Sequence, residues 1–163
     1  MRSLIYTLLA ILSFVLLTAG CNDTCLENRN ALPLAGFYAQ DAEGVLQQVE
    51  VDSLAVTGVG MEGDSLLSAK TQTKSQLYMP FRIDSDRTQY AFIAYSDYGE
   101  ARDTVTFEYT RLARLASAEC GVSYIFQIHE IRTQGVLFDS VVCPKGFIDN
   151  ENIENLQIYM RTE

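Results

Sequence analysis

The 163-residue sequence contains a single histidine, His129, and only four cysteines, so it offers little of the chemistry that metal sites and catalytic centres use. A zinc site needs about four nitrogen or sulfur ligands, and no second pair of thiols lies at metal-binding spacing. A catalytic histidine needs an orienting carboxylate and a nucleophile within reach, and no motif supplies them. The sequence therefore predicts no metal, no cofactor and no enzymatic activity.

Basic residues are also scarce, with 12 Lys and Arg against 21 Asp and Glu and a formal net charge of −9. This excess argues against partners made of nucleic acid and against direct binding to an anionic lipid surface. The glycine-rich segment 57–63 is not followed by the Lys-Ser/Thr pair of a phosphate-binding loop, so its glycines predict a turn. Asp84 and Asp86 likewise fit turn chemistry better than acid–base catalysis.

Charge is absent from residues 4–20, which follow the short basic start Met1-Arg2-Ser3. A basic start, an apolar stretch and small residues before a cleavage site are typical of a secretory signal peptide. The alternative, a membrane-spanning helix, needs about 20 apolar residues. This run is shorter, ends in Thr-Ala-Gly and has no basic residue directly after it. We therefore expect residues 1–20 to be removed on export.

The end of this stretch, Leu17-Thr18-Ala19-Gly20-Cys21, resembles a bacterial lipobox, which directs lipid onto a cysteine and cleavage just before it. Small residues before the cut give the peptidase access to the backbone, whereas Thr18 departs from the usual aliphatic residue. The resemblance implies lipidation of Cys21, followed by a tether that extends to residue 33. Several acyl chains on one residue would anchor the protein stably in a membrane.

Residues 34–163 alternate between apolar strands and turn residues. Strands are expected over 34–39, 46–59, 65–69, 77–83, 88–95, 103–110, 122–132, 136–143 and 155–161. Many short strands at this spacing predict one mostly β domain, an antiparallel β-sandwich that is immunoglobulin-like or similar, with little helix beyond the signal peptide. The segment 111–119 has the spacing of a short helix, and its state stays open.

The strongest pattern lies in 77–110, where three expected strands share one apolar face. A tight turn at 85–86 would set Phe81 beside Tyr90, and pairing across the loop 96–101 would set Phe107 opposite Phe92. A one-residue slip would turn every side chain over, so this mutual agreement supports the predicted sheet. Aromatic and aliphatic residues on the reverse face and in the following loop are candidate partner-binding residues: Tyr78, Ile93, Tyr95 and Tyr98.

Three cysteines remain beyond Cys21, in a chain whose export would allow disulfides to persist. A hairpin over 122–143, turning at Gln134-Gly135, would place Cys143 opposite Phe126 and leave Cys120 about 20 Å away. Bridged Cα atoms lie within about 7 Å. A Cys120–Cys143 disulfide is therefore disfavoured, while Cys25 on the tether could reach either cysteine. We predict Cys25–Cys120, because Cys120 lies at a strand entry beside Gly121. Cys143 at an apolar strand end would then be a free, buried thiol.

Asp followed by Ser or Thr occurs six times, against about 1.3 expected from composition. Four of these pairs continue with Leu or Val. One explanation is that Asp and Ser favour the start of a strand. The tripeptides also resemble the O-glycosylation motif of Bacteroidota, which implies four candidate acceptors: Ser65, Ser53, Thr104 and Ser140. Exposure to an enzyme favours Ser65, whereas Ser53 lies inside an expected strand and is expected to be less accessible.

Together with the lipobox, three further stretches, VDSLAVTGVG (51–60), AECG (118–121) and NLQIYM (155–160), resemble a family of small Bacteroidota lipoproteins of unknown function. The resemblance implies an outer-membrane lipoprotein with a β domain. We expect a lipid-anchored, non-catalytic accessory or binding subunit of an outer-membrane complex. The alternative is a cell-surface module that binds glycan or protein. The resemblance implies that surface export in that phylum is signalled by a run of acidic residues after the lipidated cysteine. Only Asp23 and Glu27 are present here, so the side of the membrane stays open.

Overall fold

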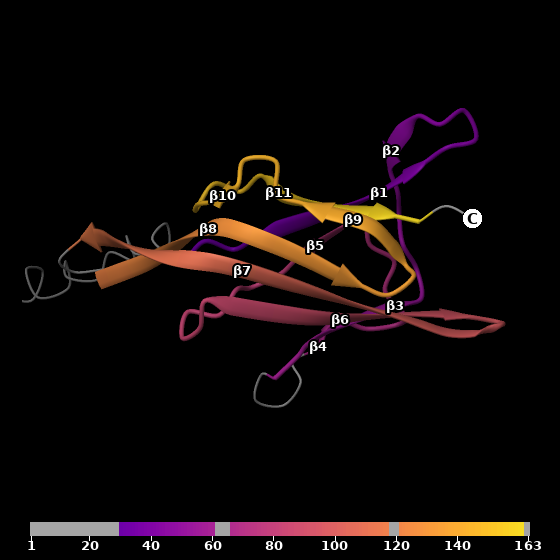
Figure 1. Ribbon diagram of the computed structural model, residues 1–163, viewed down its shortest axis with the longest axis horizontal. Coiled ribbons are helices and arrows are strands. Elements are labelled where there is room, and N and C mark those ends of the chain that lie inside the picture. The colour runs from indigo at the N-terminus through magenta and orange to yellow at the C-terminus, as the bar shows by residue number, and fades with distance from the viewer. Residues whose placement is uncertain (1–29, 61–65, 118–120, 162–163) are drawn as a thin grey trace, which may run out of the picture.

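The computed structural model describes residues 30–60, 66–117 and 121–161, which form two β-sheets packed face to face (Figure 1). Within these ranges the regular structure is all strand, without helix. The predicted mostly β sandwich is confirmed. The predicted signal peptide lies outside the described residues, as do four of the predicted site residues: Cys21, Cys25, Ser65 and Cys120.

The first sheet is built around β1 (Leu34–Gln40), which pairs in parallel with β11 (Glu154–Met160). β11 pairs on its other side with the antiparallel strand β9 (Phe138–Val142). Two short antiparallel strands share the remaining edge of β1. β5 (Gln76–Tyr78) pairs with its first half and β2 (Leu46–Gln48) with its second half.

The second sheet is antiparallel throughout and has six strands. Their spatial order is β10 (Phe147–Ile148), β8 (Gly121–Gln134), β7 (Gly99–Ser117), β6 (Arg87–Ser96), β3 (Leu54–Gly58) and β4 (Leu66–Ser68). β7 and β8 form a long ribbon that runs along the molecule in Figure 1.

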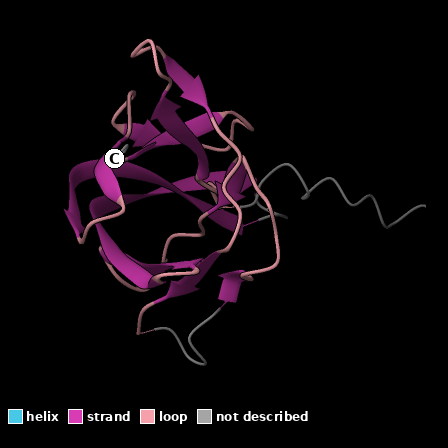
Figure 2. Ribbon diagram, turned by 90° about the vertical axis from the view of Figure 1, so that its right-hand side faces the viewer, coloured by secondary structure: helices cyan, strands magenta, loops and turns pink. Residues whose placement is uncertain are grey.

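The core lies between the two sheets, because every second side chain of each long strand points inward. Figure 2, viewed along the long axis, shows the two layers and the loops that join them. Aromatic rings from both layers meet there, with the Phe92 and Phe138 ring centroids 4.9 Å apart. The largest fully buried side chains are Phe37, Met79, Tyr90, Phe92, Phe107, Tyr109, Phe126, Phe138, Ile148, Leu156 and Ile158.

The predicted hairpin between 77–83 and 88–95 is wrong. β5 ends at Tyr78 and pairs with β1, and residues 79–86 cross from the first sheet to the second as a loop. Pro80 has no N–H to continue a ladder, and its carbonyl instead accepts a hydrogen bond from the Tyr90 hydroxyl. Met79 and Phe81 are buried as expected, although they reach the core from a crossing loop.

The predicted pairing of β6 with β7 is confirmed, but its register is shifted by four residues. Phe92 lies opposite Asp103 and not opposite Phe107. The two strands continue to Ser96 and Gly99, where Gly99 closes a tight turn with φ of 134°. Because the shift is an even number, the apolar face keeps its orientation and Phe107 stays buried.

Two expected strand boundaries also change. β7 continues as strand through 111–117, the segment whose state the sequence left open. The long strand expected over 46–59 divides into β2 and β3, which belong to different sheets, and Val51 between them forms an isolated bridge with Lys74. Ser53 interrupts it with a positive φ of 51°, a backbone conformation that a strand does not accommodate.

The predicted hairpin over 122–143 is wrong as well, because β9 belongs to the first sheet and pairs with β11. The chain turns at Gly135, which has φ of 146°, and crosses between the layers. Phe126 lies opposite Ile148 of β10, so the argument that placed Cys143 across from it fails. The Cys25–Cys120 disulfide stays a prediction. Cys143 is a half-buried free thiol, and burial raises its pKa.

Candidate functional site

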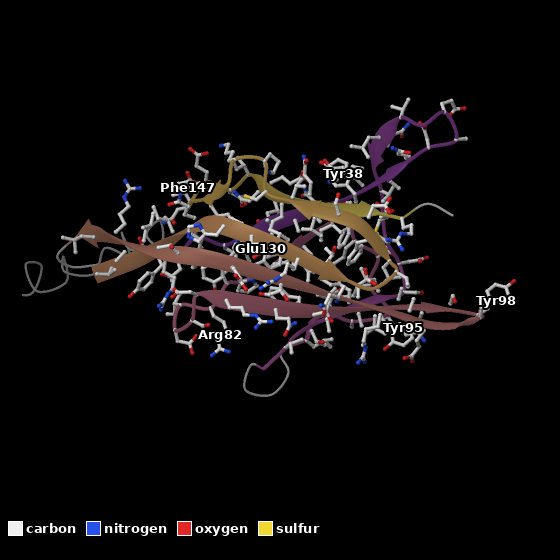
Figure 3. All side chains as sticks on the ribbon, in the orientation of Figure 1. Tyr38, Arg82, Tyr95, Tyr98, Glu130 and Phe147 are labelled. Carbon is white, nitrogen blue, oxygen red and sulfur yellow. The ribbon has the colours of Figure 1, made fainter. Side chains whose placement is uncertain are left out.

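The four predicted partner-binding residues do not form one surface. Tyr78 lies on β5 of the first sheet, whereas Ile93 and Tyr95 lie half-exposed on β6 of the second. Tyr98 is fully exposed in the β6–β7 turn, at the far end of the molecule in Figure 3. The separation follows from the pairing of β5 with β1, which the sequence did not reveal.

The described O-glycosylation candidates have different surroundings. Ser53 is half-buried before β3, and its carbonyl accepts the Tyr95 N–H. Thr104 is half-buried in the middle of β7, where both sides of the strand are paired. Ser140 is half-buried on β9, at the edge of the first sheet. Of these three, Ser140 lies on an edge strand, which leaves one side of its backbone open to an approaching enzyme.

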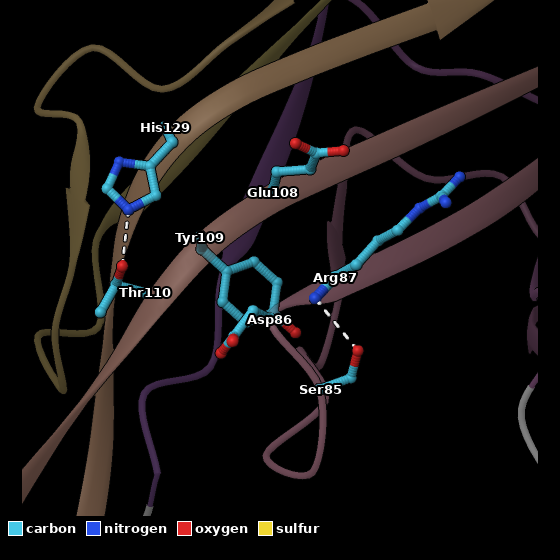
Figure 4. A pocket seen from close by; sticks show the side chains of 7 residues that line it. All are labelled: Ser85, Asp86, Arg87, Glu108, Tyr109, Thr110 and His129. Carbon is cyan, nitrogen blue, oxygen red and sulfur yellow. Dashed lines mark hydrogen bonds between the residues drawn. The ribbon is translucent and has the colours of Figure 1, made fainter.

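A shallow depression of about 450 Å³ lies over β7 and β8 and contains the only histidine (Figure 4). Its lining residues are Ser85, Asp86, Arg87, Glu108, Tyr109, Thr110 and His129. His129 is the extra residue of a β-bulge, because Tyr109 pairs with Ile128 while Glu108 pairs with Glu130. The bulge brings the His129 Nε2 within 2.6 Å of the Thr110 Oγ1.

Three of the other polar groups of this depression are engaged with neighbours. Asp86 accepts a hydrogen bond from the Arg111 Nε at 2.7 Å, and Glu108 forms an ion pair with Arg132. The Tyr109 hydroxyl donates to the Arg82 carbonyl at 2.8 Å, and burial raises its pKa. No group of three potential metal ligands occurs in the described parts of the chain. The depression therefore offers a Thr–His pair without an assembled catalytic triad.

A second candidate site covers the outer face of the first sheet, and we call it the tyrosine face. It consists of Tyr38 on β1, Gln76 and Tyr78 on β5, and Glu154, Gln157 and Tyr159 on β11. The parallel pairing of β1 with β11 places Tyr38 directly beside Tyr159, with their ring centroids 5.9 Å apart. The two rings are half-exposed, and Tyr78 is exposed.

The Glu154 carboxylate organises this face. It accepts hydrogen bonds from the Tyr38 hydroxyl at 2.6 Å, from the Gln76 Nε2 at 3.2 Å and from the Gln157 Nε2 at 3.3 Å. Gly36 makes room for it, since a Cβ at that position would overlap the carboxylate. The result is a fixed array of aromatic rings and polar groups on an open sheet face.

The Glu154 hydrogen bond raises the pKa of Tyr38 to about 12, with burial as the next cause. We expect Glu154→Gln to lower this pKa toward 10. An NMR titration of the protein labelled with ¹³Cζ-tyrosine measures it, and the signal missing from Tyr38→Phe identifies Tyr38. The fold favours the protonated phenol, so its stabilising contribution is complete below pH 10 and is lost as the pH rises through about 12. An unchanged Tyr38 titration in Glu154→Gln would contradict this arrangement, and Glu100→Gln, at an exposed position on β7 of the second sheet, is the matched control.

The sequence analysis found only Tyr78 of the tyrosine face. One signal for the rest was Gly36, because a glycine inside an apolar strand often marks the close approach of another group. Tyr38 and Tyr159 lie near opposite ends of the chain, and only the parallel pairing of β1 with β11 joins them. No local pattern reports that pairing.

Comparison with known proteins identifies the family. No helix in the described ranges is both long and apolar enough to cross a membrane. No curated protein and no solved structure matches the chain. Residues 53–160, which include β3 to β11, match DUF6452, described as a family of unknown function. This match covers well over half of the sequence, and the chain therefore belongs to the DUF6452 family.

Proposed function

We propose that this protein is a lipid-anchored, non-catalytic envelope protein that binds a protein partner through the tyrosine face, as an accessory subunit of an outer-membrane complex. The observation that carries the binding role is the Glu154 carboxylate, which fixes Tyr38 and two glutamines on a half-exposed face. The signal-peptide pattern and the lipobox resemblance at Cys21 support the anchor.

The tyrosine face suits protein binding because its side chains are already ordered. Tyrosine combines a large apolar surface with a polar hydroxyl, which is why it recurs at the centres of interfaces. Ordering a long side chain on association costs about 0.5–1.5 kcal/mol. Gln76 and Gln157 are held by Glu154 in the free protein, so a partner would meet a preformed pattern of donors and acceptors.

A crosslinking experiment in cells tests this function. A photoreactive benzoylphenylalanine replaces exposed Tyr78, and the matched control carries it at Tyr98, at the β6–β7 turn. We expect a discrete adduct with one envelope protein from position 78 and none from position 98. Adding Cys21→Ser should abolish that adduct, since an unanchored chain loses the high local concentration at the membrane. An adduct at position 98 alone would contradict the proposed face.

A cell-surface glycan-binding module is the second candidate, favoured by one observation. The paired Tyr38 and Tyr159 rings offer a surface on which a sugar ring would stack. The Glu154 carboxylate and the Gln157 amide beside them would hydrogen-bond to its hydroxyl groups. Protease treatment of intact cells, followed by a blot with a periplasmic control protein, separates the two. Loss of the band together with no protein adduct from position 78 would favour the glycan-binding role, and protection would favour the periplasmic accessory role.

A further inference from the structure

One end of the β7–β8 ribbon exposes apolar side chains that the rest of the sandwich does not cover. We call residues 110–115 of β7 and 121–127 of β8 the ribbon end. Leu115 pairs with Val122, and these side chains are 70% and 53% exposed. Leu112 is 38% exposed and lies three residues before Leu115, so the two leucines project from opposite faces of the ribbon. Apolar exposure on both faces distinguishes this ribbon from a sheet that is solvated on one side.

The charge of the ribbon end is opposite to that of the whole protein. Its described residues include Arg111 and Arg114 and no Asp or Glu, whereas the full chain has a net charge of −9. Glu119 lies outside the described residues. Arg111 pairs with Asp86 of the neighbouring loop, while Arg114 is exposed. Exposed leucine and valine beside an arginine are the composition of a protein surface that enters a lipid interface.

The N-terminal segment meets the sandwich at this same end. The Ala31 N–H donates to the Tyr124 carbonyl at 2.8 Å, and the Tyr124 N–H donates to the Asn30 Oδ1 at 2.9 Å. Ala31 is buried, so the fold begins before the expected boundary at residue 34. Asn30 follows Cys21 by nine positions in the chain, and nine fully extended steps span at most about 32 Å. A lipid on Cys21 would therefore hold the ribbon end near the membrane.

The other end of β7 lies much farther from the point where the N-terminal segment joins the sandwich. From Leu115 to Gly99, β7 extends for 16 residues, which corresponds to about 54 Å of strand. Tyr98 follows that far end, and Figure 3 shows it at the tip of the long axis. The tether is thus attached at one end of an elongated molecule, and the exposed apolar residues lie at that end.

We propose that the ribbon end inserts Leu112, Leu115 and Val122 into the lipid interface of the membrane that carries the anchor, with Arg114 at the level of the headgroups. This inference rests on the lipid anchor in the proposed function. The insertion adds a second, weaker membrane contact to the acyl chains. It also fixes the orientation of the domain, with the β6–β7 turn pointing away from the membrane.

Tryptophan fluorescence provides the test, because the natural sequence contains no tryptophan. The full-length lipidated protein carries Leu115→Trp, and the matched control carries Tyr98→Trp at the other end of the ribbon. Both are reconstituted into vesicles of phosphatidylethanolamine and phosphatidylglycerol, with or without brominated phosphatidylcholine. We expect a blue-shifted emission and at least twofold quenching by brominated lipid at position 115, with water-like, unquenched emission at position 98.

The other outcomes identify what fails. Flotation with the vesicles but unquenched, water-like emission at position 115 would overturn the insertion and leave the anchor intact. A blue shift without bromine quenching would show that another protein or a second copy covers the ribbon end, which also overturns it. A lipidated preparation that does not float, like the Cys21→Ser variant, would overturn the anchor and the inference together.

Discussion

Replacing Asp103 with alanine is expected to lower the free energy of unfolding by about 3–4 kcal/mol. Asp103 lies in the middle of β7, is 1% exposed and points toward the crossing between β8 and β9. Its carboxylate accepts the backbone N–H groups of Val136, Leu137 at 2.9 Å and Phe138 at 3.0 Å. Without it, the buried Phe138 N–H loses its acceptor, and each charge-assisted hydrogen bond contributes about 1.5–3 kcal/mol.

Urea denaturation of the full-length protein in detergent, followed by circular dichroism, measures this effect. Asp52→Ala is the matched control, because Asp52 is an exposed aspartate before β3 and should change stability by less than about 0.5 kcal/mol. Asp103→Asn keeps one acceptor oxygen, but its side-chain amide N–H groups would face the backbone N–H groups. Two donors cannot hydrogen-bond to each other, so we expect this variant to be destabilised as well. Equal stabilities of Asp103→Ala and Asp52→Ala would show that the crossing does not depend on the carboxylate.

The position of Asp103 also explains one of the six Asp-Ser/Thr pairs. Gly135 approaches Asp103 so closely that a Cβ at Gly135 would overlap the carboxylate. Together the two residues turn the chain from the second sheet to the first. Asp103 does not start a strand, since β7 begins at Gly99, so the explanation from strand starts does not hold here. The aspartate of this tripeptide stabilises a crossing, and whether Thr104 is glycosylated stays a prediction.

The sequence predicted the sandwich and most strand faces, but it failed at the partners of β5 and β9. Period-two alternation reports which side chains share a face, and Val105, Phe107 and Tyr109 are all buried as expected. It does not report which strand lies alongside. At Pro80 and at Gly135 the chain crosses between layers within a few residues. Proline and glycine also mark hairpin turns, so the sequence alone does not distinguish such a crossing from a hairpin.

The same limitation explains the incomplete prediction of the tyrosine face. Tyr78 was found because it belongs to a recognisable strand, but its assumed neighbours Ile93 and Tyr95 lie on the other sheet. Its true neighbours depend on a parallel pair between the first and last described strands. Pairings between segments far apart in the chain follow from how the whole core packs, and no short window of sequence contains that information.

Phe81→Ala is expected to lower the free energy of unfolding by about 3–5 kcal/mol, the cost typical of removing a buried aromatic ring. Phe81 is buried although it lies in the crossing loop between β5 and β6. Its ring centroid is 4.8 Å from that of Tyr109, 4.9 Å from Phe107 and 5.3 Å from Phe126. The loop has no strand partner there, so this contact with β7 and β8 and the loop's hydrogen bonds to Tyr90, Tyr109 and Arg111 attach it to the second sheet.

Ile83→Ala, two residues along the same loop, is the matched control, since Ile83 is exposed and its removal should cost much less. Hydrogen exchange gives a second readout. Loss of the Phe81 ring should speed exchange of the Tyr109 N–H, which donates to the Asp86 carbonyl of this loop at 3.0 Å, before it affects β1 or β11. If Phe81→Ala and Ile83→Ala were equally stable in urea, the aromatic contact could not be what joins the loop to the second sheet. The hydrogen bonds from Tyr90, Tyr109 and Arg111 would then be what holds the loop.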